Sequence, residues 1–451
     1  MIKIKIPKDV KLILNILNDN NYEAYVVGGC VRDSILNRSP NDWDICTSAK
    51  VEDMIDIFIA AGYEVIPTGI KHGTITVVIN KNTYEVTTFR IDGEYSDSRH
   101  PDYIEFTTDI VADLSRRDFT INAIAYNPKT GIVDPFLGLA DIENKFIKCV
   151  GNPQDRFSED ALRILRAIRF SCQLDFTIEP DTYCCIKDMY RKLEAISQER
   201  ITAELNKMIM CDSFYQNFID MPELFSFIIP ELEPCVNFNQ NNPHHNHTVY
   251  DHIAYAISYA PKDLITKLAL LFHDIGKPNC KTDDENGISH YYGHAVESEL
   301  IADTVMKRMK YDNDTRQAVV ELVKYHDSTV TARHNAIKKW LNKIGEHQLR
   351  RLIKIRIADV LAQKLDYKDD RIYNANMVSN IIDEVIAQES CFLLKDLKVS
   401  GKQLLAIGFK EGPQIGQVLA KLLQLVIDDD IENDEKILLE KAKELFDELN
   451  N

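Results

Sequence analysis

The chain has 451 residues, too many for a single hydrophobic core, and its apolar (45%) and charged (27%) fractions are those of an ordinary globular protein. Its net charge of −17 argues against a broad, non-specific nucleic-acid binder but leaves room for a local basic groove. No apolar run is long enough to span a membrane, the N-terminus lacks a signal-peptide layout, and the ten cysteines form no CxxC pair. We therefore expect a soluble cytoplasmic protein of several domains, without a disulfide framework.

The first third of the chain is predicted to be mixed α/β. Residues 25–27 predict a short strand, the glycine pair Gly28-Gly29 predicts a turn, and residues 31–36 predict a helix after it. Glycines after a strand let backbone N–H groups approach an anion closely, and Arg32 can add a charge-assisted bond to phosphate. This turn therefore predicts a site for a nucleoside triphosphate.

Two aspartates, Asp42 and Asp44, follow the glycine turn. On a strand, side chains two residues apart project from the same face, about 6.6 Å apart. Two carboxylates at that spacing can hold divalent cations that prefer oxygen ligands. An exposed acidic loop is the alternative. Together with the glycine turn, the pair favours two-metal phosphoryl transfer, in which one ion activates a hydroxyl and the other steadies the leaving pyrophosphate.

Two β-branched runs, 74–80 and 83–89, predict the strands of a hairpin that turns at Lys81-Asn82. Glu85 on the second strand is a candidate third carboxylate for the aspartate pair. A solvent-facing strand residue is the alternative for Glu85, and we favour it from the sequence alone.

Helical periodicity replaces the mixed pattern after residue 151, and no later strand is predicted. Asp160, Arg163, Arg166 and Arg169 recur at every third position, which would align them along one ridge of a helix. An ordinary Asp–Arg pair on an exposed face is one interpretation. It is the one that this spacing favours by itself. Together with the upstream motifs, base chemistry offers another: cytosine and adenine present an amino donor beside an unprotonated ring nitrogen, so a carboxylate and an arginine fit these bases and reject uracil and guanine.

The second half of the chain contains a set of spaced histidines. His273-Asp274 ends an apolar helix in LALLFHDIGKP, His252 lies upstream, and His294 and His326 lie downstream. Imidazole and carboxylate groups suit transition-metal ions, so the set favours a metal site over histidines with structural roles.

The C-terminal region has glycine turns and lysines in KVSGKQLLAIGFKEGPQIGQVL, residues 398–419. Glycine turns before helices suit phosphate contacts, and ordinary helix caps are an equally good interpretation. The acidic run at 428–435 is expected to be a solvated connection between helices.

Several blocks of the first 175 residues resemble, in order and spacing, the signature of the class II tRNA nucleotidyltransferases, which comprise the CCA-adding enzymes and the bacterial poly(A) polymerases. The blocks are GGCVRD and NDWDICTSA (28–49), TTFRIDGEYSDSRHP (87–101), LSRRDFTINAIAYNP (114–128), VDPFLGLADI (133–142) and FSEDALRILRAIRFSCQL (157–174). The resemblance implies a polymerase-β-like palm in which Asp42 and Asp44 bind Mg²⁺.

The same resemblance implies roles for further residues. The positions expected to bind nucleotide are Gly29, Arg32, Arg117, Asp160, Arg163, Arg166 and Arg169, with Asp160 and Arg163 as the base-selecting pair. RIDGEYSDSRHP, with Asp92, Asp97 and Arg99, is similar to a family loop implicated in switching from C to A addition, so its presence favours a complete CCA adder. SQERITAEL (197–205), with Arg200, resembles a neck motif that braces the base-selecting helix.

Residues 240–365 resemble an HD-type phosphohydrolase domain. The positions that match its metal-binding pattern are His252, His273, Asp274 and Asp359, and His294 and His326 are candidate ligands of a second metal. A divalent transition metal there would activate water against a phosphoester.

We therefore predict an α/β nucleotidyltransferase palm (1–150), a helical nucleotide-selecting neck and body (151–236), an HD-type helical domain (237–390) and a helical tRNA-binding tail (391–451). The predicted function is the addition of CCA, from CTP and ATP, to tRNA that lacks its 3′ CCA, without an obligatory protein partner. The alternatives are a poly(A) polymerase, an A-only adding enzyme, or an HD phosphohydrolase with an RNA-binding front half.

Overall fold

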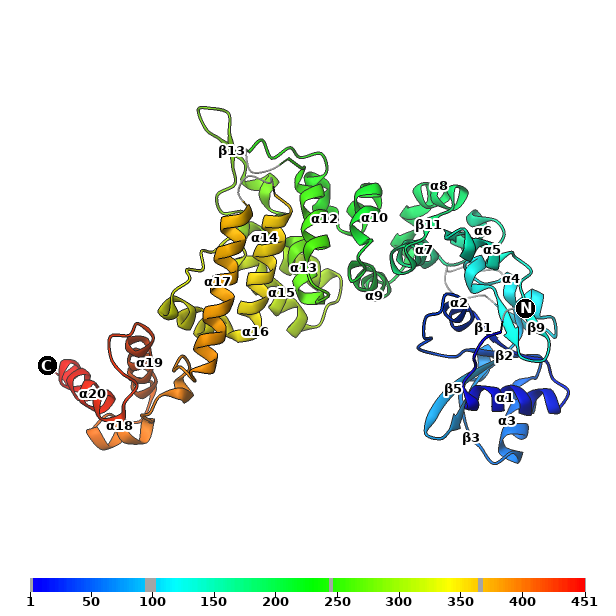
Figure 1. Cartoon of the computed structure of the whole chain (residues 1–451), viewed down its shortest axis with the longest axis horizontal. Helices are drawn as coiled ribbons and strands as arrows, with labels where there is room; N and C mark the ends of the chain where they lie inside the picture. The colour runs from blue at the N-terminus through cyan, green and yellow to red at the C-terminus, as the bar shows by residue number, and fades with distance from the viewer. Residues whose placement is uncertain (1–2, 94–102, 243–245, 364–367, 451) are drawn as a thin grey trace. The chain divides into compact units, whose positions relative to one another are not determined.

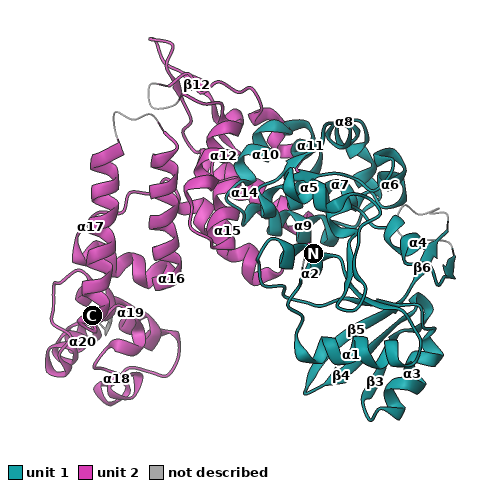
Figure 2. Cartoon of the chain, turned by 45° about the vertical axis from the view of Figure 1, so that its right-hand side comes forward, with its two compact units in different colours: residues 1–228 teal, residues 229–451 magenta. Residues whose placement is uncertain are grey.

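The structure is a computed structural model that describes residues 3–93, 103–242, 246–363 and 368–450 (Figure 1). It divides into two compact units, residues 1–228 and 229–451, which Figure 2 colours separately. The first unit contains the main β-sheet, and the second is almost wholly helical in its described part. The predicted order of an α/β part followed by a helical body is confirmed. The boundaries of the four predicted domains stay predictions.

A mixed sheet of seven strands, ordered β3-β4-β5-β2-β1-β8-β9, forms the centre of the first unit. The strands are β1 (Ala24–Val27), β2 (Ile45–Thr47), β3 (Glu64–Gly69), β4 (Thr74–Ile79), β5 (Asn82–Thr88), β8 (Ala125–Asn127) and β9 (Gly131–Val133). β2 and β5 pair in parallel, whereas the other neighbours in this sheet are antiparallel. A separate hairpin consists of β6 (Arg90–Asp92) and β7 (Ile104–Phe106).

Five helices accompany this sheet: α1 (Lys8–Asp19), α2 (Gly29–Ile35), α3 (Val51–Ala60), α4 (Ile110–Ser115) and α5 (Gly138–Glu143). α4 is short, and its Ile110 and Leu114 pack against Tyr25, Val27 and Cys46, which share one face of the sheet. This packing brings the end of α4, and the arginines that follow it, to the β1–β2 part of the sheet.

The hairpin between β4 and β5 turns one residue earlier than predicted. Asn80 and Lys81 both have positive φ (50° and 67°), while Asn82 already pairs with Ile79. A two-residue loop with both φ values positive matches the right-handed twist of the strands, and asparagine tolerates this conformation. The turn is therefore Asn80-Lys81.

The rest of the first unit is mainly helical. Its helices are α6 (Pro153–Glu159), α7 (Leu162–Leu174), α8 (Pro180–Met189), α9 (Gln198–Ile209), α10 (Phe214–Asp220) and α11 (Pro222–Ile228). The prediction that one helical ridge carries Asp160 and the three arginines is wrong. Asp160 has an extended backbone (φ −140°, ψ 104°) and its carboxylate accepts a hydrogen bond from the Leu162 N–H (3.0 Å), so it separates α6 from α7 and caps the start of α7.

The second unit contains α12 (Val249–Tyr259), α13 (Leu264–Phe272), α14 (His294–Arg308), α15 (Asn313–Tyr325), α16 (His334–Leu361), α17 (Lys368–Ala387), α18 (Gly401–Ile407), α19 (Pro413–Ile427) and α20 (Glu435–Asn450). α16 is interrupted at Gly345, whose positive φ of 76° is not helical. The prediction of no strand after residue 151 is wrong in detail, because two-residue strands occur at β11 (Thr177–Ile178), β12 (Thr282–Asp283) and β13 (Ser289–His290). Each is too short to give a period-2 pattern.

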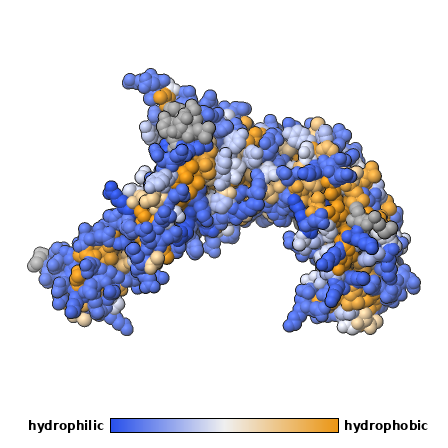
Figure 3. All heavy atoms as spheres, viewed as in Figure 1, coloured by the Kyte–Doolittle hydropathy of each residue, from blue (hydrophilic) through white to orange (hydrophobic). Residues whose placement is uncertain are grey.

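The last three helices form a small apolar cluster of their own. The acidic run connects α19 to α20 and is largely exposed, as predicted. Two of its aspartates also form ion pairs with α16, Asp428 with Lys339 and Asp429 with Lys338 (2.7 Å). The visible face of the chain is mostly hydrophilic (Figure 3). None of the described helices combines the length and the apolar character that a membrane crossing requires.

Candidate functional site

A tight glycine turn connects β1 to α2. Gly28 has φ 79°, which is in the left-handed region that glycine adopts without strain. A Cβ at Gly28 would lie 3.1 Å from Nη1 of Arg117, and a Cβ at Gly29 would lie 3.7 Å from Nη2 of Arg32. The two predicted arginines therefore flank the turn, and the absence of side chains at both glycines lets them approach its backbone.

The two aspartates lie beside this turn, in the extended segment immediately before β2. The prediction that both aspartates lie within a strand is therefore wrong, because β2 starts at Ile45, one residue after Asp44. The segment still pairs with β1, because the Asp44 carbonyl accepts a hydrogen bond from Val27 N–H (3.0 Å). Both residues are exposed overall, although protein atoms around the Asp44 carboxylate remove part of its hydration. Loss of hydration raises the pKa of Asp44, Arg117 opposes this shift, and repulsion from Asp42 adds to it.

Glu85 lies on β5, which pairs in parallel with β2 from Ile45 and Val86 onward. Glu85 is exposed, as the favoured interpretation of a solvent-facing strand residue predicts. The carboxylates of Asp42 and Asp44 are the oxygen ligands that a hard divalent cation prefers, so these two residues fit the predicted magnesium site.

Three of the predicted arginines surround one aromatic ring, that of Phe170 on α7. The guanidinium carbons of Arg32, Arg166 and Arg169 lie 5.0, 5.4 and 4.2 Å from the ring centroid. Each has a polar partner: Arg32 donates to Asn122 (2.6 Å) and to Asp33, while Arg169 pairs with Glu204 (2.7 Å). The cluster thus joins Arg32 of α2 to Arg166 and Arg169 of α7, and Arg32 and Arg169 are buried in it.

Asp118 links this cluster together, and no role was predicted for it. Its carboxylate accepts hydrogen bonds from Arg166 (2.6 and 2.8 Å) and from Asn122 (3.0 Å), which in turn binds Arg32. Burial would raise the pKa of Asp118, but Arg166 and Asn122 lower it to about 2. The only sequence signal for this role is its place inside the RRDFTIN block.

The predicted base-selecting residues are held by different partners. Asp160 pairs with Arg200 of α9 (3.0 Å), in the segment that resembles a neck motif. Arg163 is buried, pairs with Glu159, and donates to the carbonyl of Arg116 (3.0 Å). The simple alternative, an Asp160–Arg163 surface pair, is therefore not the arrangement in the structure. Asp97 and Arg99 of the predicted loop lie outside the described residues.

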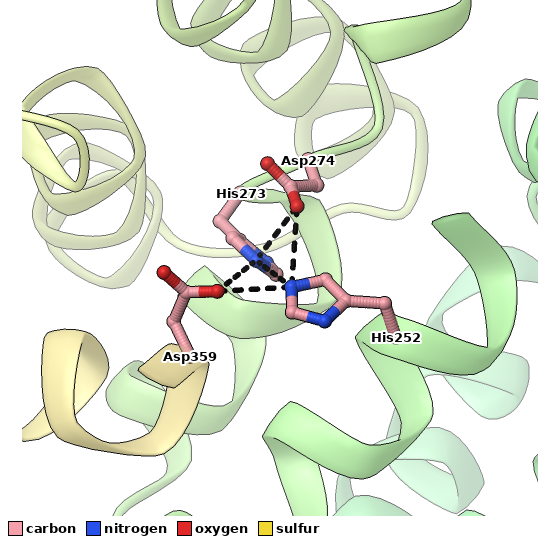
Figure 4. Close-up of side chains that lie close together, drawn as sticks. All are labelled: His252, His273, Asp274 and Asp359. Carbon is pink, nitrogen blue, oxygen red and sulfur yellow. Dashed lines mark hydrogen bonds and ion pairs between the residues drawn. The ribbon is translucent and has the colours of Figure 1, made fainter. Parts of the chain in front are cut away.

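A second cluster lies within residues 229–451 (Figure 4). It consists of His252, His273, Asp274 and Asp359, each with one ligand atom within 4.8 Å of the others. The Nε2 of His252 lies 2.9 Å from Asp359 and 3.3 Å from Asp274, and the Nε2 of His273 lies 3.2 Å from Asp274. His252, His273 and Asp274 are buried. All four predicted ligands are therefore brought together.

A further group of potential metal ligands, Asp274, His294 and His326, shares Asp274 with the first group. The Nδ1 atoms of His273, His294 and His326 lie 2.7–2.8 Å from the backbone carbonyls of Leu270, Tyr291 and Val323. Donation from Nδ1 to a carbonyl leaves the lone pair of Nε2 directed at the cluster, which is the arrangement of metal-binding histidines. The donor set therefore fits two transition-metal ions that share one carboxylate.

The ionisable groups in this cluster shift one another's pKa values. Burial opposes charge on each group, yet His273 and Lys277 hold the pKa of Asp274 well below its usual range. Conversely, Asp274 and Asp359 raise the pKa of His273 to about 10 despite its burial. Lys277 contacts Asp274 directly (2.6 Å). Two adjoining cavities, of about 330 and 310 Å³, are lined by some of these ligands, namely Asp274, Asp359, His294 and His326. Cationic side chains also line them, among them Lys277, Arg356 and Arg371.

Comparisons with known proteins agree on one family. A model of the poly A polymerase head domain matches residues 24–148, one described as "Probable RNA and SrmB-binding site of polymerase A" matches residues 175–236, and one of tRNA nucleotidyltransferase domain 2 matches residues 293–442. The CCA-adding enzyme of Lactobacillus johnsonii is 32% identical over 95% of both chains. That of Enterococcus faecalis is 32% identical over 97% of this chain and 95% of its own. The chain belongs to the CCA-adding enzymes.

Solved structures agree with this assignment. The Bacillus stearothermophilus CCA-adding enzyme, crystallised in complex with CTP, is 25% identical, covers 98% of both chains and superposes with a TM-score of 0.75. A Thermotoga maritima CCA-adding enzyme complexed with tRNA shares the fold, with 20% identity and a TM-score of 0.62. The predicted family, the nucleotidyltransferase class and the fold class are confirmed. As a nucleotidyltransferase of this family, the chain requires a divalent metal ion.

Proposed function

We propose that this CCA-adding enzyme adds C, C and A, from CTP and ATP, to the 3′ end of tRNA without a nucleic-acid template. One observation carries the proposal: the carboxylates Asp42 and Asp44 lie beside the Gly28-Gly29 turn and its flanking arginines, in a chain that is about one-third identical to CCA-adding enzymes along almost its whole length. A tRNA-processing role is consistent with the expected cytoplasmic location and does not call for a protein partner.

Asp42 and Asp44 would hold Mg²⁺. When bound, the ion lowers the pKa of the primer 3′-hydroxyl and neutralises charge on the leaving pyrophosphate. Arg117 and Arg32 bind the triphosphate at the glycine turn. The buried Nε of Arg117 lacks a hydrogen-bond partner among the described residues, so it is a donor that a phosphate oxygen can satisfy. The 3′-oxygen then attacks the α-phosphorus in line, and pyrophosphate leaves.

Base selection is assigned to Asp160 and Arg163. The Asp160 carboxylate accepts from the exocyclic amino group of cytosine or adenine, while Arg163 donates to the neighbouring ring nitrogen. Both side chains now hold protein partners, Arg200 and Glu159, so these contacts must be exchanged or shared when a base binds. Uracil and guanine present a carbonyl beside an N–H, which leaves both protein groups unpaired and is costly.

The test uses purified protein, Mg²⁺ and a tRNA that ends at its discriminator base. Labelled CTP alone should yield two added cytidines, and CTP with ATP should yield a complete CCA end by product sequencing. Incorporation of A alone would instead identify a poly(A) polymerase or an A-only adding enzyme. Asp42→Asn should remove incorporation of both nucleotides.

A second function, metal-dependent hydrolysis of a phosphoester, is favoured by the two ligand groups that share Asp274. A divalent transition metal held by His252, His273, Asp274 and Asp359 would activate water. Lys277 and Arg371 line the adjoining cavity, where they bind phosphate. Water attacks phosphorus, the ester P–O bond breaks, and the alcohol leaves.

Hydrolysis is tested with p-nitrophenyl phosphate and Mn²⁺, Co²⁺, Ni²⁺ or Mg²⁺ as the only added metal. His273→Ala should abolish p-nitrophenol release and retain CCA addition, whereas Asp42→Asn should do the opposite. Absence of hydrolysis with every metal would reject this second function. If Asp42→Asn left CCA addition intact, the front half would be an RNA-binding module instead.

A further inference from the structure

Asp113 is a buried carboxylate next to the nucleotide site that the mechanism above does not use. It lies on α4, and its side chain is only 1% exposed. Arg116 and Arg117 follow it by three and four residues, the spacing at which side chains meet along one face of a helical turn. Burial would raise the pKa of Asp113, but Arg116 and Arg117 lower it, so the carboxylate is ionised.

The Asp113 carboxylate bonds to three neighbours at once. Its Oδ1 accepts from Arg116 Nε (3.1 Å) and Nη2 (2.8 Å) and from the backbone N–H of Arg90 (3.3 Å). Its Oδ2 pairs with Nη2 of Arg117 (3.3 Å). Two adjacent guanidinium groups repel each other, and the carboxylate that they share reduces this repulsion. Arg116 also pairs with Asp92 (3.5 Å), whereas Asp113 is the carboxylate that contacts both arginines.

Two of these neighbours, Arg117 and Arg116, lead to parts of the nucleotide site. The Nη1 of Arg117 reaches the glycine turn, 3.1 Å from where a Gly28 Cβ would be, and its charge lowers the pKa of Asp44. The Arg116 carbonyl accepts the hydrogen bond from Arg163, one of the two base-selecting residues. One carboxylate therefore contacts the residues that fix both the triphosphate position and the base-selecting arginine.

We propose that Asp113 is a positioning residue for nucleotidyl transfer: it holds Arg117 at the glycine turn and, through the backbone of Arg116, holds Arg163 in place for base selection. The inference rests on the proposed CCA addition. A positioning role differs from a purely structural role, in which Asp113 would only stabilise the fold. It also differs from a purely electrostatic role, in which Asp113 would act only through its negative charge near the triphosphate. Removal of its negative charge would by itself strengthen triphosphate binding, whereas loss of positioning weakens it.

The first test is Asp113→Asn, which keeps the size of the side chain and removes the charge. We expect kcat/KM for CTP on the truncated tRNA to fall about tenfold or more, because misplaced reacting groups lose rate steeply. We also expect weaker binding of a non-hydrolysable CTP analogue and a higher ratio of U and G to C incorporation. A structural role would not change that ratio, and an electrostatic role would tighten binding of the analogue.

Asp109→Asn is the matched control, because Asp109 caps α4 by accepting from Val111 N–H (2.8 Å) and does not belong to the arginine group. Asparagine retains an oxygen that can accept from Val111 N–H, so this variant removes a charge from α4 while keeping the cap, and it should leave the selectivity unchanged. Asp113→Glu keeps the charge but moves it by one methylene, so kcat/KM should fall between those of wild type and Asp113→Asn.

If Asp113→Asn does not fold, Asp113→Glu decides the question. Wild-type efficiency and selectivity in the variants that fold, or changes equal to those of Asp109→Asn, would overturn the inference. Wild-type protein that adds no nucleotide would instead reject the proposed function itself, before any variant is compared.

Discussion

Two aspartates of the first unit have opposite pKa shifts, which follow from their surroundings. Asp44 has lost hydration and faces Asp42, so its pKa is raised, whereas Asp118 lies between Arg166 and Asn122, so its pKa is lowered to about 2. The raised pKa of Asp44 means that two negative charges at this site are unfavourable unless a cation balances them, which is the behaviour of a metal site. A carboxylate that is ionised and fully paired is instead a structural and positioning element.

Asp44→Asn should lower the rate of nucleotidyl transfer by roughly 100- to 1,000-fold, and it should not lower the stability of the fold. Because the folded-state pKa of Asp44 is raised, its ionisation costs stability as pH rises through that pKa. The metal-free melting temperature of Asp44→Asn at neutral pH should therefore equal or exceed that of wild type, and the difference should vanish as the pH is lowered. Thermal melts in a chelator measure this. A strongly destabilised variant would show that Asp44 is a structural residue.

Asp118→Asn should destabilise the protein at neutral pH, because it leaves Arg166 without its carboxylate. The lowered pKa of Asp118 adds about 2 kcal/mol of stability that is fully present above pH 4 and is lost as pH falls towards 2. Urea unfolding of both proteins at pH 6 and pH 3 should therefore show a smaller difference at the lower pH. Asp19→Asn, which removes an exposed carboxylate, is the control for a lost surface charge. A difference independent of pH would contradict the assignment.

At this scale, the sequence could predict which residues belong to the site, but not which residues they pair with. The glycine pair, the two aspartates and the arginines could be selected because their chemistry is local in the sequence. Arg166 with Asp118, and Asp160 with Arg200, are separated by 48 and 40 residues. Only the fold brings such pairs together, so the sequence left Asp160 with an incorrect partner.

At the scale of elements, the break between α6 and α7 determines how Asp160 and Arg163, the proposed base-selecting residues, are presented. A spacing of three suggested one continuous helix, but Asp160 caps α7 through its own side chain. An aspartate side chain can accept a hydrogen bond from a nearby backbone N–H and so end one helix and start the next. A periodic pattern of residue types does not show such a break. The carboxylate that would read the base is thus placed at a helix terminus and braced from α9.

Asp160→Ala should therefore relax base choice more than it slows the reaction, with incorporation of U and G relative to C rising about tenfold. Arg200→Met should produce a smaller change in the same direction, because it removes the brace of Asp160 and not the base contact itself. Single-nucleotide incorporation with each of the four triphosphates measures both. An equal loss for all four nucleotides would refute the base-selecting role.

At the scale of the whole chain, a net charge of −17 must be reconciled with binding to a polyanion. Only local positive surfaces can contact phosphates, and the predicted ones include Lys402 and Lys410 of the tail, which are both exposed. The fold class and the order of the α/β and helical parts could be predicted, since they depend on long runs of periodic sequence. The division into two units instead depends on contacts between distant segments.

Lys402→Ala with Lys410→Ala should weaken tRNA binding and leave binding of a CTP analogue unchanged. Each lost phosphate contact should reduce the slope of log K against log salt by about one. Filter binding across a salt series measures the slope, and Lys436→Ala on α20 is the matched control. An unchanged slope in the double variant would exclude both lysines from the tRNA interface.

The carboxylates at the glycine turn belong wholly to residues 1–228, whereas both histidine-containing ligand groups belong wholly to residues 229–451. A substitution of one of these histidines would therefore leave every residue of the proposed nucleotidyl-transfer site in place. Likewise, a substitution of Asp42 or Asp44 would leave the proposed hydrolytic ligands in place, so evolution could change either site independently.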